Sequence, residues 1–319
     1  MTRLSNDTAE LVPRTEHDGP ELRFDLPGLA IGVAEYDEGP TGCTVFHFPD
    51  GAAVETDVRG GSPGTIGAFE FVDAICLAGG SLLGLEAATG VAAELLAARD
   101  YRIGWLEMPD VAGAIIFDFG RRDNAVYPDK DLGRAALRAA RPGRFPLGPR
   151  GAGRSATVGK TFEFGQGEPS GQGGAFRQLG PTKLAVFTVV NAVGAIVDRD
   201  GTVVRGHRHP DSGARHALVE ELERRLAAGE PTRPVAGNTT LTVVVTNQRL
   251  DRRVLQQLAR QVHASMARAI HPFHALFDGD VLYAVTTGEV ENETLDSVTL
   301  GVLASELAWD AVLTCFERS

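Results

Sequence analysis

Residues 236–245 read AGNTTLTVVV, a small polar group followed by an apolar, β-branched run. The run predicts a buried strand, and the sheet around such a strand would hold the residues at its start rigidly. If the peptide bond before Thr239 were cut, this residue would carry a free α-amine beside its own hydroxyl, which is a nucleophile with a built-in base. On its own, the stretch favours the simpler interpretation of a polar loop entering an ordinary strand.

Length and charge limit the classes of function. A chain of 319 residues can form one large domain or two ordinary ones with a substantial core. Its 38 glycines are spread along the sequence, which is typical of a fold with many tight turns. The net charge of −11 argues against nucleic acid and against an anionic membrane surface as partners.

The cysteines and the N-terminus indicate a cytoplasmic protein. Cys43, Cys76 and Cys315 are an odd number in apolar surroundings without metal-like spacing, so we expect buried thiols in a reducing compartment. Residues 1–21 are polar and acidic, which predicts a flexible arm and no signal peptide. No apolar run approaches the length that spans a membrane.

Predicted strands and helices alternate along the chain, which indicates a mixed α and β class with sheets buried under helices. A polar segment, 207–234, ends directly at the Asn238-Thr239 pair and is the best linker in the sequence. We expect strands at 29–33, 44–48, 75–78, 115–119, 184–190, 195–197 and 281–287. We expect helices from Ser81, over 132–140, over 214–228, after an Asp251 cap, and over 295–316.

Several motifs do not predict a bound group. The Gly-Lys-Thr at 159–161 lacks the glycine spacing of a phosphate loop, and Gly171–Gly174 has no surrounding βαβ unit. The histidines match no zinc spacing, so we expect neither a metal nor a cofactor. Residues 278–280, Asp-Gly-Asp, fit either a tight turn before a strand or a carboxylate pair that orients a nucleophile, and the turn is the simpler interpretation.

Taken together, these stretches resemble one family from about Leu22 to the C-terminus. The chain is similar to the L-aminopeptidase/D-esterases and β-peptidyl aminopeptidases, and within them to the nylon-oligomer branch of 6-aminohexanoate-oligomer endo-hydrolases. The motifs that carry the resemblance follow one another in order at 26–28, 38–42, 59–61, 76–80, 127–130, 171–173, 191–194, 237–240 and 278–280.

The resemblance implies an α+β fold, an αββα sandwich of the N-terminal-nucleophile type. It implies a single catalytic domain, 22–319, that cuts itself between Asn238 and Thr239 into fragments 1–238 and 239–319. Thr239 would be the nucleophile, with Asp278 and Asp280 in a relay with it. Lys160 and Asn191 match substrate- and oxyanion-contacting positions. The cleaved units would assemble as a homotetramer, a dimer of dimers.

One position departs from the family pattern. Where the family usually has a tyrosine that positions the reacting carbonyl, this sequence has Phe117 at the matching substrate-binding position. A hydroxyl donor would then be missing, and one such donor is typically worth roughly 3 kcal/mol. Asn191 or a main-chain amide would carry more of the oxyanion stabilisation.

The implied activity is hydrolysis of linear amides, with nylon-type 6-aminohexanoate oligomers cut internally. Three alternatives stay open. The enzyme would act as an aminopeptidase on peptides or β-peptides, or as an acyltransferase, because ornithine acetyltransferase-like enzymes also use a self-generated N-terminal threonine. A chain that stays uncleaved would be a non-catalytic binding or assembly protein.

Overall fold

The computed structural model describes residues 3–67, 69–209, 211–231 and 235–317. The larger strands are β2 Ala30–Tyr36, β3 Thr41–Val58, β5 Phe71–Ala78, β6 Val111–Ile115, β11 Gln172–Leu179, β12 Thr182–Asn191, β15 Thr239–Gln248 and β17 Val281–Val290. The shorter ones are β1 Glu21–Arg23, β4 Thr65–Ile66, β7 Arg141–Pro142, β8 Arg144–Pro146, β9 Thr157–Val158, β10 Glu168–Pro169, β13 Ala195–Val197, β14 Val203–Arg205 and β16 Ile270–His271. The α-helices are α1 Leu85–Ala98, α2 Lys130–Arg138, α3 Leu218–Ala228, α4 Arg252–Ser265 and α5 Ser297–Leu313.

The long strand β3 connects two layers of sheet. Residues 41–47 of β3 pair with β2 and β5, and residues 53–58 pair antiparallel with β17, across an irregularity between His47 and Ala52. The hydrogen-bonded order is β11-β12-β15-β17-β3-β5-β6-β4, with β2 beside β3. β15 therefore lies in the middle of its layer, antiparallel to β12 and parallel to β17.

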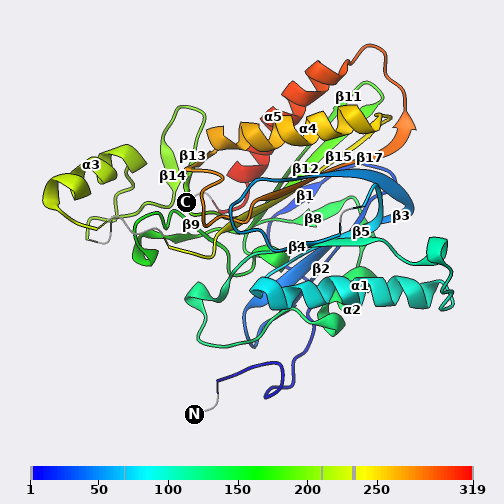
Figure 1. Ribbon diagram of the computed structural model, residues 1–319, viewed down its shortest axis with the longest axis horizontal. Helices are drawn as coiled ribbons and strands as arrows, with labels where there is room; N and C mark the ends of the chain where they lie inside the picture. The colour runs from blue at the N-terminus through cyan, green and yellow to red at the C-terminus, as the bar shows by residue number, and fades with distance from the viewer. Residues whose placement is uncertain (1–2, 68, 210, 232–234, 318–319) are drawn as a thin grey trace.

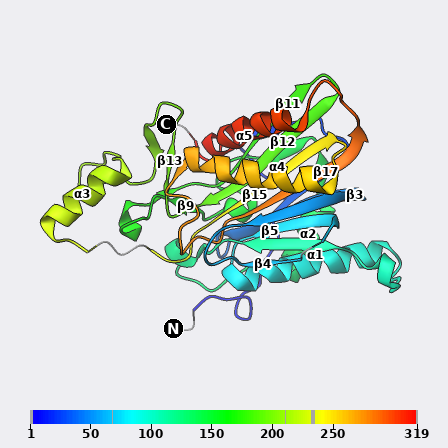
Figure 2. The same ribbon diagram turned by 45° about the horizontal axis from the view of Figure 1, so that its top comes forward.

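Three apolar clusters separate the layers. One lies between the sheets and includes Phe46, Phe187 and Tyr283. A second lies between the β12-β15-β17 layer and helices α4 and α5, and a third between the β2-β3-β5 layer and helices α1 and α2. Figure 1 shows α4 and α5 on one side of the strands and α1 and α2 on the other, and Figure 2 shows the same order from a turned view. The architecture is the predicted αββα sandwich.

Most predicted elements are present, with two differences. The strand predicted at 115–119 ends at Ile115, because the buried Asp118 carboxylate accepts hydrogen bonds from Gly80 N at 2.9 Å and Thr41 Oγ1 at 2.6 Å and so turns the chain. The helix predicted over 214–228 begins only at Leu218. The predicted Asp251 cap is confirmed, since its carboxylate accepts a hydrogen bond from Val254 N.

The prediction that no apolar run approaches the length of a membrane span is wrong for one helix, by length and composition. The turn at Ser81–Gly84 and α1 together form an 18-residue helix with mean hydropathy 1.4, which is long and apolar enough to cross a membrane by these criteria alone. A third of this helix is buried, and it packs against α2, β5 and β6. The core helix of a folded domain meets the same criteria, and the side chains of Ala87, Ala88, Val91 and Leu95 belong to the third cluster.

The N-terminal arm lies against the body of the molecule. Arg14 and Glu35 exchange two main-chain hydrogen bonds of 2.9 Å, and Asn6 Nδ2 donates to Asp129 at 2.9 Å. Its predicted flexibility stays a prediction. In the linker, α3 lies to one side of the four layers (Figure 1), and Pro234 falls outside the described residues.

Candidate active site

Thr239 is the first residue of β15 and is 4% exposed. All ten residues of β15 are buried, and hydrogen-bonded strands flank it on both sides. Directly opposite Thr239 in the antiparallel register lies Asn191, the last residue of β12. The register of the two β-branched strands brings these two residues side by side, and the roles that the resemblance implies for them stay predictions.

The peptide bond between Asn238 and Thr239 has a specific environment. Thr239 Oγ1 donates to the carbonyl oxygen of Asn238 at 2.5 Å. The main-chain N–H of Gly279 donates to the same oxygen at 2.8 Å. The carbonyl carbon lies one C=O bond, about 1.2 Å, from that oxygen, so the hydroxyl lies beside the atom that it would attack. An N–H at 2.7–3.1 Å is the geometry that stabilises a developing oxyanion.

The Asp278-Gly279-Asp280 segment forms the turn that enters β17, and it is also part of this environment. Asp278 accepts main-chain hydrogen bonds from Val193 at 3.2 Å and Ala275 at 3.0 Å. Burial, and then the charge of Asp280, raise the pKa of the Asp278 carboxyl. The segment can therefore be both the tight turn before β17 and a pair of carboxylates close to Thr239.

Asp280 contacts Thr240, the residue after Thr239. Its carboxylate accepts hydrogen bonds from Thr240 N at 2.7 Å and from His274 Nδ1 at 2.9 Å. Among the described residues, the hydrogen bond of the Thr239 hydroxyl goes to Asn238, and neither aspartate accepts it. The structure brings both carboxylates beside the start of β15, and their relay with Thr239 stays a prediction.

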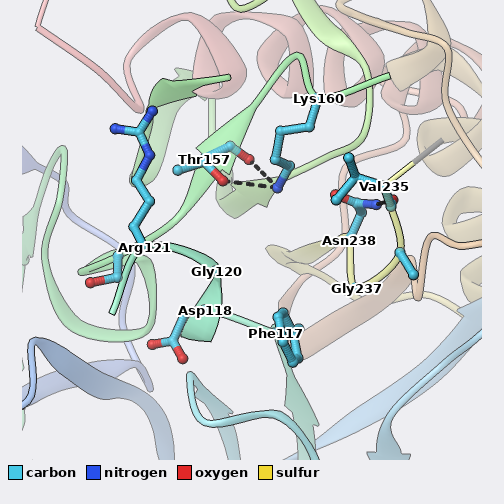
Figure 3. A pocket seen from close by; sticks show the side chains of 11 residues that line it. Phe117, Asp118, Gly120, Arg121, Thr157, Lys160, Val235, Gly237 and Asn238 are labelled. Carbon is cyan, nitrogen blue, oxygen red and sulfur yellow. Dashed lines mark hydrogen bonds between the residues drawn. The ribbon is translucent and has the colours of Figure 1, made fainter. Parts of the chain in front are cut away.

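Lys160 and Asn191 form one buried hydrogen-bonded unit. Lys160 Nζ donates to Thr157 O and Thr157 Oγ1, both at 2.9 Å, and to Asn191 Oδ1 at 3.1 Å, and Figure 3 shows the lysine directed at Thr157. Burial lowers the pKa of Lys160 to about 7, and the charge of Arg121 acts in the same direction, whereas Asp278 opposes it. The amine is thus able to exchange a proton near neutral pH.

The Asn191 amide is fully engaged in this uncleaved chain. Its Nδ2 donates to Phe117 O at 3.0 Å and to Gly237 O at 3.4 Å. The Phe117 ring is 39% exposed and packs on the main chain of Gly237, where an added Cβ would lie 2.8 Å from the ring. Asn191 therefore tethers the segment just upstream of Asn238.

A small cavity adjoins this segment. It has a volume of about 120 Å³, and its wall includes Phe117, Arg121, Lys160 and residues 235–238 (Figure 3). Thr239, which is 4% exposed, is not part of its wall.

Comparison with known proteins places the chain in a family. The profile of Peptidase family S58 matches residues 24–319. The chain belongs to peptidase family S58. It is 48% identical over 318 residues to the 6-aminohexanoate-oligomer endohydrolases of Agromyces sp. (strain KY5R) and of Paenarthrobacter ureafaciens, covering 97% of this chain and 89% of each relative. Family membership makes it an amide-bond hydrolase.

A solved structure supports the fold of this S58 peptidase. The L-aminopeptidase D-Ala-esterase/amidase from Ochrobactrum anthropi, described as a variant of the Ntn hydrolase fold, matches with a TM-score of 0.64 at 16% identity. The match covers 94% of this chain and 88% of that chain. The predicted fold class, an N-terminal-nucleophile type of sandwich, is confirmed at the level of the fold.

Two groups of this S58 site were missed by sequence reasoning. A main-chain donor such as Gly279 N–H has no signature in the sequence, although the tight Asp-Gly turn is a signal that the amide is exposed on one side. His274, one of the histidines that match no zinc spacing, contacts Asp280 and lies with its ring centroid 4.4 Å from that of the buried His263. In turn, His263 Nδ1 contacts Asp57 at 2.9 Å.

The described part of the S58 chain holds no group of three or more His, Cys, Asp or Glu side chains arranged to bind a metal ion. His207, His209 and His216 lie near one another, with the rings of His207 and His216 stacked at 6.0 Å. Burial lowers the pKa of His207 to about 4. The absence of a metal and of a cofactor stays a prediction. Cys43, Cys76 and Cys315 are free and buried, as predicted.

Proposed function

We propose that this S58 peptidase cuts its own chain between Asn238 and Thr239 and then uses Thr239 as an N-terminal nucleophile on linear amides. The substrates we propose are oligomers of the 6-aminohexanoate type, cleaved at internal amides. One observation carries the proposal: the Asn238 carbonyl oxygen accepts hydrogen bonds from both Thr239 Oγ1, at 2.5 Å, and Gly279 N–H, at 2.8 Å. The names of the relatives at 48% identity support the substrate class.

Self-cleavage proceeds in two steps. The Thr239 oxygen adds to the Asn238 carbonyl carbon while Gly279 N–H stabilises the oxyanion. The C–N bond then breaks, and the proton lost by the hydroxyl ends on the Thr239 nitrogen, which becomes an α-amine. Water hydrolyses the resulting ester, which frees the Asn238 carboxylate and restores the Thr239 hydroxyl.

Turnover repeats this chemistry on a substrate amide. The new α-amine, with an unperturbed pKa of about 7.7–8.0, accepts the hydroxyl proton as Thr239 attacks. The leaving amine takes a proton, and water releases the acyl group from Thr239. Asn191, Lys160 and Gly279 N–H supply donors to the oxyanion. Asn191 gains a free N–H when the Gly237 carbonyl withdraws with the upstream end of the cut.

Departure of the upstream segment also opens the site. Residues 235–238 line the small cavity, and Thr239, the next residue, is 4% exposed in the uncleaved chain. Phe117, which is partly exposed in the wall of that cavity, contributes an apolar surface suited to a methylene chain. We therefore assign to Phe117 a substrate-binding role rather than an oxyanion contact.

Denaturing mass spectrometry tests the proposal. We expect the 33.8 kDa chain to be replaced by fragments 1–238 and 239–319. Thr239→Ala should stay intact and lose hydrolysis of a linear 6-aminohexanoate oligomer by roughly 10⁶-fold, to background, whereas Thr239→Ser keeps a hydroxyl and should still cleave. An intact, fully active wild-type chain would overturn the nucleophile assignment. Products from internal amides distinguish internal cleavage from removal of one end unit at a time.

We further propose that the cleaved units form a homotetramer in the cytoplasm. The buried free thiols support a reducing compartment. Exposed apolar side chains gather just after α1, with Ile103 at 80%, Trp105 at 91% and Leu106 at 95% exposed, and such a patch is typical of an interface between subunits. Light scattering on the purified protein measures the assembly, and a monomeric mass would contradict it.

A further inference from the structure

A second and larger cavity lies beside the candidate active site. It has a volume of about 520 Å³, and its wall carries three arginines, Arg121, Arg205 and Arg208. Arg121 also lines the small cavity beside Asn238, so the two cavities meet at this residue. In Figure 3 the Arg121 side chain lies on the opposite side of the view from Asn238. We call the larger one the arginine cavity.

Positive charge in the arginine cavity is only partly balanced. Among the described residues that line it, the one acidic side chain is Glu168. Its carboxylate accepts two hydrogen bonds from Arg215, at 2.7 and 3.0 Å, and one from Gly206 N at 2.8 Å. Arg205 lies 3.8 Å from it. Against the three lining arginines, the described cavity wall thus offers one carboxylate, and that one is already engaged by Arg215, in a chain whose net charge is −11.

The three lining arginines keep donors for a ligand. Each donates to a main-chain carbonyl of the cavity wall, Arg121 at 2.5 Å, Arg205 at 2.7 Å and Arg208 at 3.1 Å. A guanidinium has five N–H donors, and a neutral carbonyl does not cancel its charge. Burial, followed by the positive charge of Arg205, lowers the pKa of Arg121. Planar guanidinium groups with spare donors bind carboxylates in a bidentate manner.

The chemistry of a linear amide oligomer matches this arrangement. Its interior is neutral, and the fragment released as the amine keeps the carboxyl end of the chain. A carboxylate on that fragment is the one anionic group that such a substrate offers near the scissile amide. The active site supplies apolar surface at Phe117, and the shared residue Arg121 connects this surface with the arginine cavity.

We propose that the arginine cavity binds the terminal carboxylate of a linear amide substrate, on the leaving-amine side of the scissile bond. This inference rests on the proposed function, since it specifies the substrate of the same site. The scissile amide is still internal, and the cavity sets a preferred distance between that amide and the carboxyl end. Charge in the cavity also offsets the repulsion that an acidic protein exerts on an anionic substrate.

Kinetics on two matched substrates test the proposal. One is a linear 6-aminohexanoate oligomer with a free carboxylate, and the other is the same oligomer with a terminal carboxamide. For the wild type we expect a KM roughly tenfold lower for the carboxylate, with the ratio shrinking in high salt as the charges are screened. Arg208→Gln should bring this KM ratio close to one. Arg253→Gln, at an exposed arginine of α4 outside both cavities, should leave it unchanged.

A binding experiment separates failure of this inference from failure of the proposed function. The uncleaved Thr239→Ala protein already contains the arginine cavity, so binding of 6-acetamidohexanoate and of its primary amide can be compared by NMR titration. Binding of the carboxylate alone, lost in Thr239→Ala/Arg208→Gln, supports the cavity even if neither oligomer is hydrolysed. Equal KM values for the two oligomers, or equal binding of the two probes, would overturn it.

Discussion

The two sides of the Asn238–Thr239 peptide bond differ in how the fold holds them. Downstream, all ten residues of β15 are buried and bonded to β12 and β17. Upstream, the linker helix α3 exposes 54% of Val219 and 64% of Leu226, and residues 235–237 form part of a cavity wall. One peptide bond therefore joins ten buried strand residues to the buried Asn238, and the described residues just before it, 235–237, are partly or fully exposed.

This difference suits a bond that is cut once and for all. A nucleophile is effective when its position is fixed before the reaction, because no ordering is then required at the transition state. In the proposed mechanism the segment that ends at the released Asn238 carboxylate leaves the site, and a segment with few apolar contacts opens at a small free-energy cost. Under that proposal, the sheet holds the Thr239 side of the bond, and the described residues just upstream are held less deeply.

The largest expected effect among substitutions that keep Thr239 concerns Gly279. A Cβ at this position would lie 2.7 Å from Thr239 Oγ1 and 2.8 Å from Ser62 O. Gly279→Ala should therefore displace either the hydroxyl or the N–H that holds the Asn238 carbonyl. Loss of one oxyanion donor costs about 10²–10³ in rate, so we expect fragment formation, followed by mass spectrometry, to slow by about 10²-fold.

Gly165→Ala is the matched control, because a Cβ there meets no atom within 4 Å. It should mature at the wild-type rate. If Gly279→Ala matured equally fast, the carbonyl of Asn238 would not depend on this turn. The rigid part of the site would then consist of β15 alone, without the turn at Gly279.

A matched pair of leucines measures the comparison directly. Leu241 in β15 is fully buried, whereas Leu226 in α3 is 64% exposed. In the uncleaved Thr239→Ala protein, Leu241→Ala should lower the free energy of unfolding by about 2–5 kcal/mol, because it leaves a cavity between the sheets. Leu226→Ala should change it by less than about 0.5 kcal/mol. Denaturant unfolding measures both, and similar losses would contradict the asymmetry.

The sequence predicts the rigid side better than the rest of the site. Thr239 and Asn191 stand at the ends of two strongly β-branched runs, and such runs place their own ends in a sheet. The Asp-Gly-Asp turn is equally local. By contrast, the N–H of Gly279 belongs to the main chain. Almost every residue type carries the same N–H group, so the sequence gives no sign of its role.

Long-range contacts escape the sequence for a different reason. Arg205 and Arg208 lie three residues apart at and just after the end of β14, whereas Arg121 comes from a turn far earlier in the chain, and no sequence spacing relates it to them. His274 reaches Asp280 only because the turn between them folds back. Strand β6 ends at Ile115 and does not continue over 115–119 as predicted. Its end depends on Asp118, which accepts a hydrogen bond from Thr41 of the distant strand β3. Each of these contacts requires the folded backbone.

A further expected effect is the pH dependence that Lys160 imposes on the rigid side. Burial lowers the pKa of Lys160 to about 7 in the folded chain, whereas an unfolded lysine has a pKa of about 10.4. Between these values the unfolded state binds a proton that the folded state does not. The free energy of unfolding should therefore rise with pH from about 7 to about 10, by up to about 1.4 kcal/mol per pH unit, and fall again as the pH is lowered toward 7.

Denaturant unfolding of the Thr239→Ala protein at pH 7.5 and pH 9.5 measures this slope on a single uncut chain. Lys160→Met in the same background removes the titrating group, so its slope should be smaller by the contribution of Lys160. Lys130→Met, at an exposed lysine of α2, should keep the parent slope. The window lies above pH 7 so that the raised pKa of Asp278, which acts with the opposite sign at lower pH, contributes little. Equal slopes for Lys160→Met and its parent would mean that the lysine stays protonated in the fold, held by Asp278, and it would then serve the oxyanion as a permanent cation rather than exchange a proton.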